Sequence, residues 1–287
     1  MSRWTSRRQA FRKVLEGSAC VYPASVHDPV SARIAEDIGF ELGMFAGSVA
    51  SLAVLGAPDL IVLTLSEFAG QALRISRASE LPLMVDADHG YGNALNAMRT
   101  VEELEIAGVA GLSIEDTELP QPYGAGGAAS MLSVEAGAAK LRAAVAARRD
   151  PALAIAGRTS AAAIAGVEEA ARRVRVYATT GVDAIFLVGV KRREDLLRIV
   201  DGLTLPVILG GVPPSMADRD WLAQAGVRIC LQGHQPFAAA AQAIHDTLKA
   251  LRDGADPASL PRVATGEFMR RVSRADVYDA ATREYLD

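Results

Sequence analysis

Short apolar runs alternate with amphipathic segments along most of the chain. The runs are rich in Val, Ile, Leu and Ala, and near-continuous apolar runs of this length are typical of strands buried on both faces. Eight such strands are predicted: Ala19–Val26, Leu42–Ala46, Leu83–Asp88, Gly111–Glu115, Leu153–Ala156, Ala184–Val188, Pro206–Leu209 and Val227–Leu231.

A helical pattern follows each predicted strand. The expected helices are Pro29–Ile38, Ser66–Arg77, Ala94–Ala107, Val134–Ala147, Gly166–Thr179, Arg193–Asp201, Met216–Ala225 and Pro236–Leu251. Eight strand–helix units without an internal break predict an α/β fold, a closed (β/α)₈ TIM-type barrel. The alternative is an open doubly wound sheet, but the first turn lacks the Gly-x-Gly-x-x-Gly phosphate fingerprint of dinucleotide-binding folds.

The two ends of the chain differ from this repeat. Residues 1–253 are expected to form the catalytic barrel, with an Arg-rich surface helix over Ser2–Lys13 that we favour over a transit peptide. Gly254–Thr265 has a linker-like composition, and Glu267–Asp287 is charged with scattered apolar residues. Residues 254–287 are therefore predicted to form a linker and helices that pack on the barrel or on a neighbouring subunit.

Composition and charge exclude several classes of protein. Half of the 287 residues are hydrophobic, and the net charge is −4 with acids and bases interspersed. There is no basic stripe for nucleic acid and no apolar run near the ~20 residues that span a bilayer. Cys20 and Cys230 lie in apolar runs without metal-ligand spacing. They are expected to be buried free thiols of a cytoplasmic protein.

The C-terminal ends of the predicted strands carry the candidate chemistry. Active sites of (β/α)₈ barrels lie at this end, so polar side chains there should converge. The candidates are Ser48, Asp86, Asp88, Glu115, Arg158 and His234. Each has a simpler explanation when taken alone: a helix N-cap for the serine, surface or structural ion pairs for Glu115 and Arg158, and a satisfied core-edge histidine.

Asp86 and Asp88 carry the strongest local signal. Side chains two apart on a strand point the same way, so both carboxylates should project from the end of the strand that begins at Leu83. Two adjacent like charges are unfavourable unless a cation or a proton lies between them. Oxygen ligands suit Mg²⁺ or Mn²⁺. For an isolated Asp-x-Asp, a solvated turn is the alternative.

Four motifs resemble the isocitrate lyase / phosphoenolpyruvate mutase superfamily: Ala46-Gly-Ser-Val49, Asp86-Ala-Asp-His-Gly-Tyr-Gly92, Ile114-Glu-Asp116 and Gly157-Arg-Thr159. The resemblance runs from about Tyr22 to Ala250. Three further segments are most similar to the bacterial oxaloacetate decarboxylase branch of this superfamily: Ala24-Ser-Val-His-Asp-Pro29, Leu187-Val-Gly-Val190 and Gly233-His234.

The resemblance implies a role for each candidate residue. Asp86 would bind Mg²⁺ directly, and Asp88 and Glu115 would act through coordinated waters. A small 2-oxo acid would chelate the metal, with its carboxylate held by Ser48 and its developing enolate by Arg158. The resemblance, together with the C-terminal tail, also implies a homo-oligomer, expected to be a homotetramer built as a dimer of dimers.

The loop after the fourth strand, Asp116–Ser133, indicates the reaction. C–C lyases that resemble this chain carry an acid/base cysteine there, whereas this loop has no Cys, His or Lys. Decarboxylation of oxaloacetate needs an electron sink rather than a base, and Mg²⁺ with Arg158 would supply it. His234 would contact the leaving carboxylate or protonate the enolate. Gly124, Gly126 and Gly127 suit a flexible lid.

Other functions remain open from the sequence. The same metal site would serve a 2-oxo or 2-hydroxy acid lyase or hydrolase of the methylisocitrate, phosphonopyruvate or carboxyphosphonoenolpyruvate type. Gly157, Ser160 and the Leu209–Pro213 turn depart from the expected pattern and would widen the site or alter the substrate. Glycines after strands seven and eight also suit a phosphate-binding barrel. The non-enzyme alternative is a metabolite-binding barrel.

Overall fold

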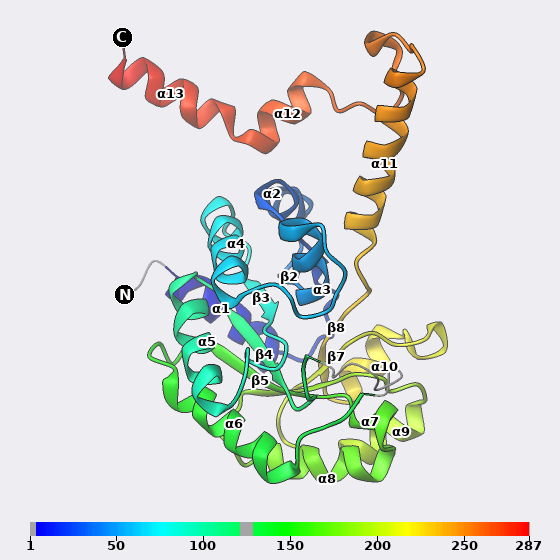
Figure 1. Cartoon of the computed structure of the whole chain (residues 1–287). Helices are drawn as coiled ribbons and strands as arrows, with labels where there is room; N and C mark the ends of the chain where they lie inside the picture. Colours follow the sequence, from blue (N-terminus) through cyan, green and yellow to red (C-terminus); the bar gives the residue numbers. More distant parts are fainter. Residues whose placement is uncertain (1–3, 121–128, 287) are drawn as a thin grey trace.

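The computed structural model describes residues 4–120 and 129–286 and contains one parallel sheet whose eight strands follow in chain order (Figure 1). The strands are β1 Ala24–Ser25, β2 Gly43–Phe45, β3 Leu83–Asp86, β4 Gly111–Glu115, β5 Ala154–Thr159, β6 Ala184–Leu187, β7 Val207–Leu209 and β8 Val227–Cys230. The sheet closes through Val21, whose amide donates to the Arg228 carbonyl at 2.9 Å and whose carbonyl accepts from the Cys230 amide at 3.0 Å. The predicted (β/α)₈ barrel is confirmed.

Helices cover the outer face of the sheet, as the amphipathic segments predict. Those before and around the barrel are α1 Thr5–Glu16, α2 Pro29–Ile38, α3 Gly47–Ala50, α4 Leu65–Ala78, α5 Ala94–Ile106, α6 Val134–Ala147, α7 Ala161–Ile164, α8 Val167–Tyr177, α9 Arg193–Ile199 and α10 Arg219–Gln224. A π-helical turn spans Ser51–Leu55, and a 3₁₀ turn spans Pro214–Met216. Apolar side chains between the sheet and this helical layer form the larger of two core clusters.

The predicted N-terminal helix is present as α1, with one face exposed and the face that carries Phe11 packed against the barrel. Phe11 is 1% exposed and belongs to the cluster that fills the barrel interior. Its ring lies so close to Gly111 that a Cβ at that position would stand 2.6 Å from it. Arg8 is also buried and donates to the Val109 carbonyl and to Asp150. The helix therefore closes the N-terminal end of the barrel, opposite the predicted site.

Strands β1 and β3 are both shorter than predicted, for different reasons. β1 holds only two residues, because the preceding chain makes a single bridge to β8 at Val21. β3 ends at Asp86, two residues before the predicted end, because Asp88 adopts a left-handed conformation with φ of 47°. A residue with positive φ cannot continue a strand. Asp88 therefore belongs to the turn that leads to α5.

The last helix of the repeat, α11 (Gln235–Arg252), leaves the barrel wall (Figure 1). None of its 18 residues is buried. The chain continues through a 3₁₀ turn at Pro257–Ser259 into α12 (Gly266–Ser273) and α13 (Ala275–Tyr285). Val272 of α12 is buried, and its carbonyl accepts from Arg33 of α2 at 3.1 Å. Within the described residues, no helix is both long and apolar enough to cross a bilayer.

Candidate functional site

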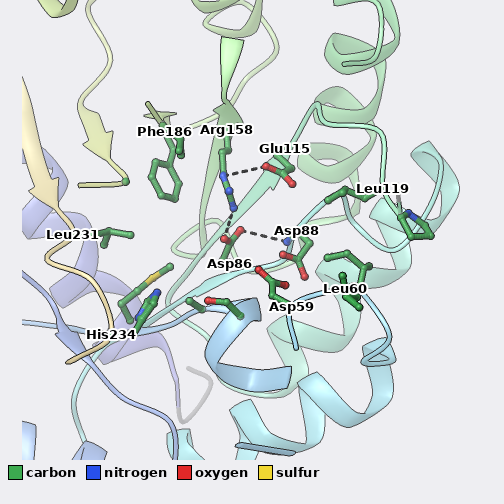
Figure 2. Close-up of a pocket in the computed structure, with 17 residues that line it drawn as sticks. Asp59, Leu60, Asp86, Asp88, Glu115, Leu119, Arg158, Phe186, Leu231 and His234 are labelled. Carbon is green, nitrogen blue, oxygen red and sulfur yellow. Dashed lines mark hydrogen bonds and ion pairs between the residues drawn. The ribbon is translucent and has the colours of Figure 1, made fainter. Parts of the chain in front are cut away.

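A cavity of about 590 Å³ opens at the C-terminal ends of the strands, and we call this opening the barrel mouth. All six candidate residues line it, together with apolar side chains on both sides of the carboxylates (Figure 2). The lining residues are Met44, Ala46, Ser48, Asp59, Leu60, Ile61, Asp86, Asp88, Glu115, Leu119, Pro120, Arg158, Phe186, Val188, Gly210, Leu231 and His234. The predicted lid glycines at positions 124, 126 and 127 lie outside the described residues.

Asp86 and Asp88 both reach the cavity, but not because they share a strand face. Asp86 ends β3, and its Oδ1 accepts from the Ser113 hydroxyl at 3.1 Å and from the Asp88 amide at 3.3 Å. Asp88 reaches the same space from its turn. Its carboxylate lies against Gly47, where a Cβ would stand 2.7 Å from both carboxylate oxygens. The start of α3 must therefore be glycine for Asp88 to hold this position.

Glu115 and Arg158 are register partners on the neighbouring strands β4 and β5. Arg158 reaches across the mouth, where its Nη1 donates to Asp86 and its Nε lies 3.2 Å from Glu115 Oε2 (Figure 2). The latter contact is an ion pair without hydrogen-bond geometry, and Nε is buried without a hydrogen-bond partner. Burial opposes the charge on Arg158, but Asp86 and Glu115 outweigh it and raise the pKa of this guanidinium. Arg158 is therefore a permanent cation.

The carboxylates at the mouth carry more negative charge than Arg158 alone can compensate. Burial, and then the carboxylates of Asp86 and Glu115, raise the pKa of Asp88 well above its usual value. Burial likewise raises the pKa of Glu115 to about 7, against the opposing effect of Arg158. Such a site is relieved by a proton or by a cation. The oxygen-only donor set fits a hard divalent ion such as Mg²⁺ or Mn²⁺.

The arrangement of these groups constrains how an ion would bind. Across residues 4–120 and 129–286, no three His, Cys, Asp or Glu side chains converge closely enough to ligate an ion together. This spacing is compatible with one direct carboxylate ligand, with the other carboxylates acting through water. Mg²⁺ commonly keeps several waters in such sites.

Ser48 and His234 line the mouth from the segments that follow β2 and β8. Ser48 lies one residue inside α3, whose N-cap is Ala46 and has no side-chain cap, so the alternative N-cap role for the serine is wrong. His234 precedes α11, and its Nδ1 lies 2.9 Å from the hydroxyl of Ser25 on β1. Burial lowers the pKa of His234 despite the nearby carboxylates of Asp86 and Asp59. The imidazole is therefore neutral at neutral pH.

Asp59 is a residue of the site that sequence reasoning missed. It lines the cavity between the π-helical turn and α4, and Figure 2 shows it beside Asp88. Burial, and then Asp86, raise the pKa of Asp59. The signal was available, because every loop that follows a barrel strand faces the active-site end. A search of whole loops, rather than strand ends alone, would have included this aspartate.

A buried hydrogen-bond network between the barrel strands and α8 supports the strand ends that carry Glu115 and Arg158. Asp116, next to Glu115, is 2% exposed, and its Oδ2 accepts from the hydroxyl of Thr159, next to Arg158, at 2.9 Å. The same oxygen accepts from Arg173 at 2.6 Å and from Tyr177 at 2.7 Å, both on α8. The network links β4, β5 and α8. Because it involves residues adjacent to Glu115 and Arg158, it fixes their backbones relative to each other.

The same network also holds both ends of the loop after β4. The Asp116 carbonyl accepts from the Leu132 amide at 2.8 Å, and Arg173 donates to the Leu132 carbonyl at 2.9 Å. The Glu118 amide donates to the Ser130 carbonyl at 2.9 Å. The two ends of the loop therefore pair with each other at the barrel wall.

Comparison with known proteins identifies related chains. Residues 11–252 match the family model described as phosphoenolpyruvate phosphomutase. An oxaloacetate decarboxylase of Rhodopseudomonas palustris (strain BisA53) is 53% identical over 283 residues, which cover 99% of this chain and 98% of the relative. An oxaloacetate decarboxylase of Bradyrhizobium diazoefficiens is 55% identical over 269 residues, covering 94% and 93%.

Solved structures show the same architecture. Phosphonopyruvate hydrolase, in a complex with oxalate and Mg²⁺, superposes with a TM-score of 0.85 at 26% sequence identity. The superposition covers 98% of this chain and 99% of the hydrolase.

Proposed function

Because the chain belongs to the phosphoenolpyruvate phosphomutase family, we propose that it decarboxylates oxaloacetate to pyruvate and CO₂ with Mg²⁺ or Mn²⁺. The observation that carries this proposal is a half-buried arginine held among carboxylates at the barrel mouth, in a chain whose relatives are named oxaloacetate decarboxylases. The loop after β4 supplies no Cys, His or Lys as an acid, which a decarboxylation does not need.

The metal would be held by Asp86 directly and by Asp88 and Glu115 through water. When bound, it would supply Lewis-acid polarisation of the keto group. Ser48, at the start of α3, lies where it can hold the substrate carboxylate that flanks the keto group. These assignments use only side chains that line the cavity.

Arg158 and His234 act on the part of the substrate that changes charge. The bond between the distal carboxylate and C3 breaks, its electron pair moves into the keto group, and CO₂ leaves. Arg158 stabilises the negative charge that develops on the oxygen, because its position is fixed before the reaction. His234 lines the mouth and contacts the leaving carboxylate. Water then protonates C3 to give pyruvate.

An assay of CO₂ release tests the proposed reaction. We expect purified protein to release CO₂ from oxaloacetate with Mg²⁺ or Mn²⁺. Addition of EDTA should stop this release, and oxalate should inhibit it. Oxalate is planar and bidentate like the enolate of pyruvate, and species that resemble the transition state bind tightly. The rate must be compared with that of the metal alone, which also promotes this reaction. Cleavage of 2-methylisocitrate or phosphonopyruvate, with oxaloacetate at the metal-only rate, would contradict the proposal.

We also propose a homo-oligomer, expected to be a dimer of dimers, in the cytoplasm. α11 carries apolar side chains at helical spacing, including Ile244 and Leu248, which are 60% and 62% exposed. Beside the start of α11 is an apolar cavity of about 650 Å³, lined by Val30, Ile34 and Ile38 of α2 among others. A second copy of the chain would cover such surfaces. The compartment is inferred from Cys20 and Cys230, which are buried free thiols.

Sedimentation measures this assembly. At micromolar concentration we expect wild-type protein to sediment as a tetramer. The Ile244→Asp/Leu248→Asp double variant should sediment as smaller species, because charged side chains oppose burial of the α11 stripe. Leu197→Asp, at an exposed leucine of α9, is the matched control and should leave the assembly unchanged. A monomeric wild type would contradict the proposal.

A further inference from the structure

Ser25 lies behind His234 and is the only described residue with which the imidazole makes a hydrogen bond. It is on β1, is 9% exposed, and its Oγ is 2.9 Å from Nδ1 of His234. Among the described residues, that Oγ has no other hydrogen-bond partner. The two residues are 209 positions apart in the chain, and the pair spans the seam where β1 meets β8.

The backbone around His234 does not fix its side chain by packing. Gly233 precedes it with a φ of 85°, and α11 follows it without a single buried residue. An imidazole at such a junction can rotate about both side-chain torsions unless a neighbour holds it. The contact with Ser25 on the rigid sheet supplies that restraint.

The direction of the hydrogen bond follows from counting donors and acceptors. A serine hydroxyl has one proton to donate, and a neutral imidazole has one N–H and one acceptor nitrogen. If Nδ1–H donated to Ser25, the buried hydroxyl proton would have no acceptor among the described residues. Leaving a buried donor without an acceptor costs more free energy than a typical hydrogen bond contributes to stability. Donation from Ser25 to Nδ1, with the imidazole proton on Nε2, is the arrangement in which the hydroxyl proton has an acceptor among the described residues.

We propose that Ser25 is a positioning residue, which fixes the His234 tautomer and directs Nε2–H toward the carboxylate that leaves as CO₂. This inference rests on the proposed decarboxylation. A neutral donor at Nε2 holds the carboxylate so that the breaking C–C bond stands out of the plane of the keto group. An imidazolium would instead stabilise the carboxylate before it loses its charge, which would slow the reaction. The lowered pKa of His234 agrees with a neutral ring.

Kinetics of three variants test the role of Ser25. We expect Ser25→Ala to lower kcat by about tenfold, the scale of one lost hydrogen bond, with KM nearly unchanged. Ser25→Thr keeps the hydroxyl and should retain most of the activity. Because Ser25 acts through His234, Ser25→Ala/His234→Ala should be no slower than His234→Ala. Ser76→Ala, which removes a buried hydroxyl without a hydrogen-bond partner on α4, is the matched control.

Two outcomes would overturn the inference. One is a kcat of Ser25→Ala within about twofold of wild type. The other concerns the double variant. If Ser25→Ala lowers kcat by the same factor in His234→Ala as in wild type, Ser25 has a structural role. Binding of oxalate should be the same in wild type and Ser25→Ala, because oxalate lacks the carboxylate that His234 is proposed to contact.

Nitrogen NMR of ¹⁵N-histidine-labelled protein tests the tautomer without substrate. The chain has four histidines, and the His234 signals are those lost in His234→Asn. At a pH of about 8, where the imidazole is neutral, we expect Nε2–H in wild type and a mixture of tautomers in Ser25→Ala. Nδ1–H in wild type would overturn the inference. Because no turnover is needed, failure of this result is distinct from failure of oxaloacetate as the substrate.

Discussion

We expect the Asp86→Ala variant to lose metal-dependent turnover, with kcat falling more than about 10³-fold to the metal-only background. Asp86 is the proposed direct ligand, and it also accepts from Ser113 and pairs with Arg158. Its deletion removes a metal ligand and leaves the arginine without one of its two carboxylates. Decarboxylation assays should be accompanied by calorimetric titration with Mn²⁺, which should show that binding is lost.

The fold should survive this change. Asp86 lies at the open end of the barrel, and its loss leaves no cavity in the apolar core. Circular dichroism and a thermal melt of Asp86→Ala would check this point. Asp201→Ala, at an exposed aspartate after α9, is the matched control and should bind Mn²⁺ and turn over like wild type. Near-normal turnover by folded Asp86→Ala would remove Asp86 from the site.

Arg158→Lys should lower kcat by at least about 10²-fold, the scale seen when one preorganised donor is lost. The guanidinium contacts Asp86 and Glu115 through different nitrogens and is held between them. A lysine keeps the charge but presents a single flexible ammonium, so it cannot hold both contacts with the same geometry. The charge would then be misplaced relative to the oxygen on which negative charge develops.

Steady-state kinetics decide what Arg158 contributes. A loss in kcat with little change in KM indicates an interaction made in the transition state. A loss confined to KM would instead make Arg158 a uniform binding group. Arg192→Lys is the matched control, because this exposed arginine pairs with Asp195 on α9 and is not among the described residues that line the cavity.

The parts of the site that sequence predicted well are those governed by strand periodicity. The apolar runs before Glu115 and Arg158 place each of them at the C-terminal end of a strand, and consecutive strands of a barrel are neighbours. Their register pairing in the structure follows from that rule. The same rule placed Ser48 and His234 at the mouth, although neither lies on a strand.

The parts that sequence missed depend on backbone torsions and on long-range packing. The turn at Asp88 has a positive φ that periodicity does not reveal, so the argument from a shared strand face was wrong, although Asp88 lines the cavity. Asp59 was overlooked because it follows a π-helical turn rather than a strand. The burial of Phe11 in α1 depends on Gly111, whose missing side chain makes room for the ring. The sequence does not show that these two distant residues meet. The detachment of α11 has no local signal, because its amphipathic pattern is that of a packed helix.

The paired ends of the loop after β4 have an evolutionary consequence. Asp116, Arg173 and Leu132 hold the two ends at the barrel wall, while Leu119 and Pro120 line the cavity. Substitutions, insertions or deletions between the two ends can therefore accumulate without displacing Glu115 or Arg158. A side chain within this segment can supply the acid or base that a given reaction needs, while Glu115 and Arg158 keep their positions. New chemistry can thus arise in one short segment while the rest of the catalytic apparatus is inherited unchanged.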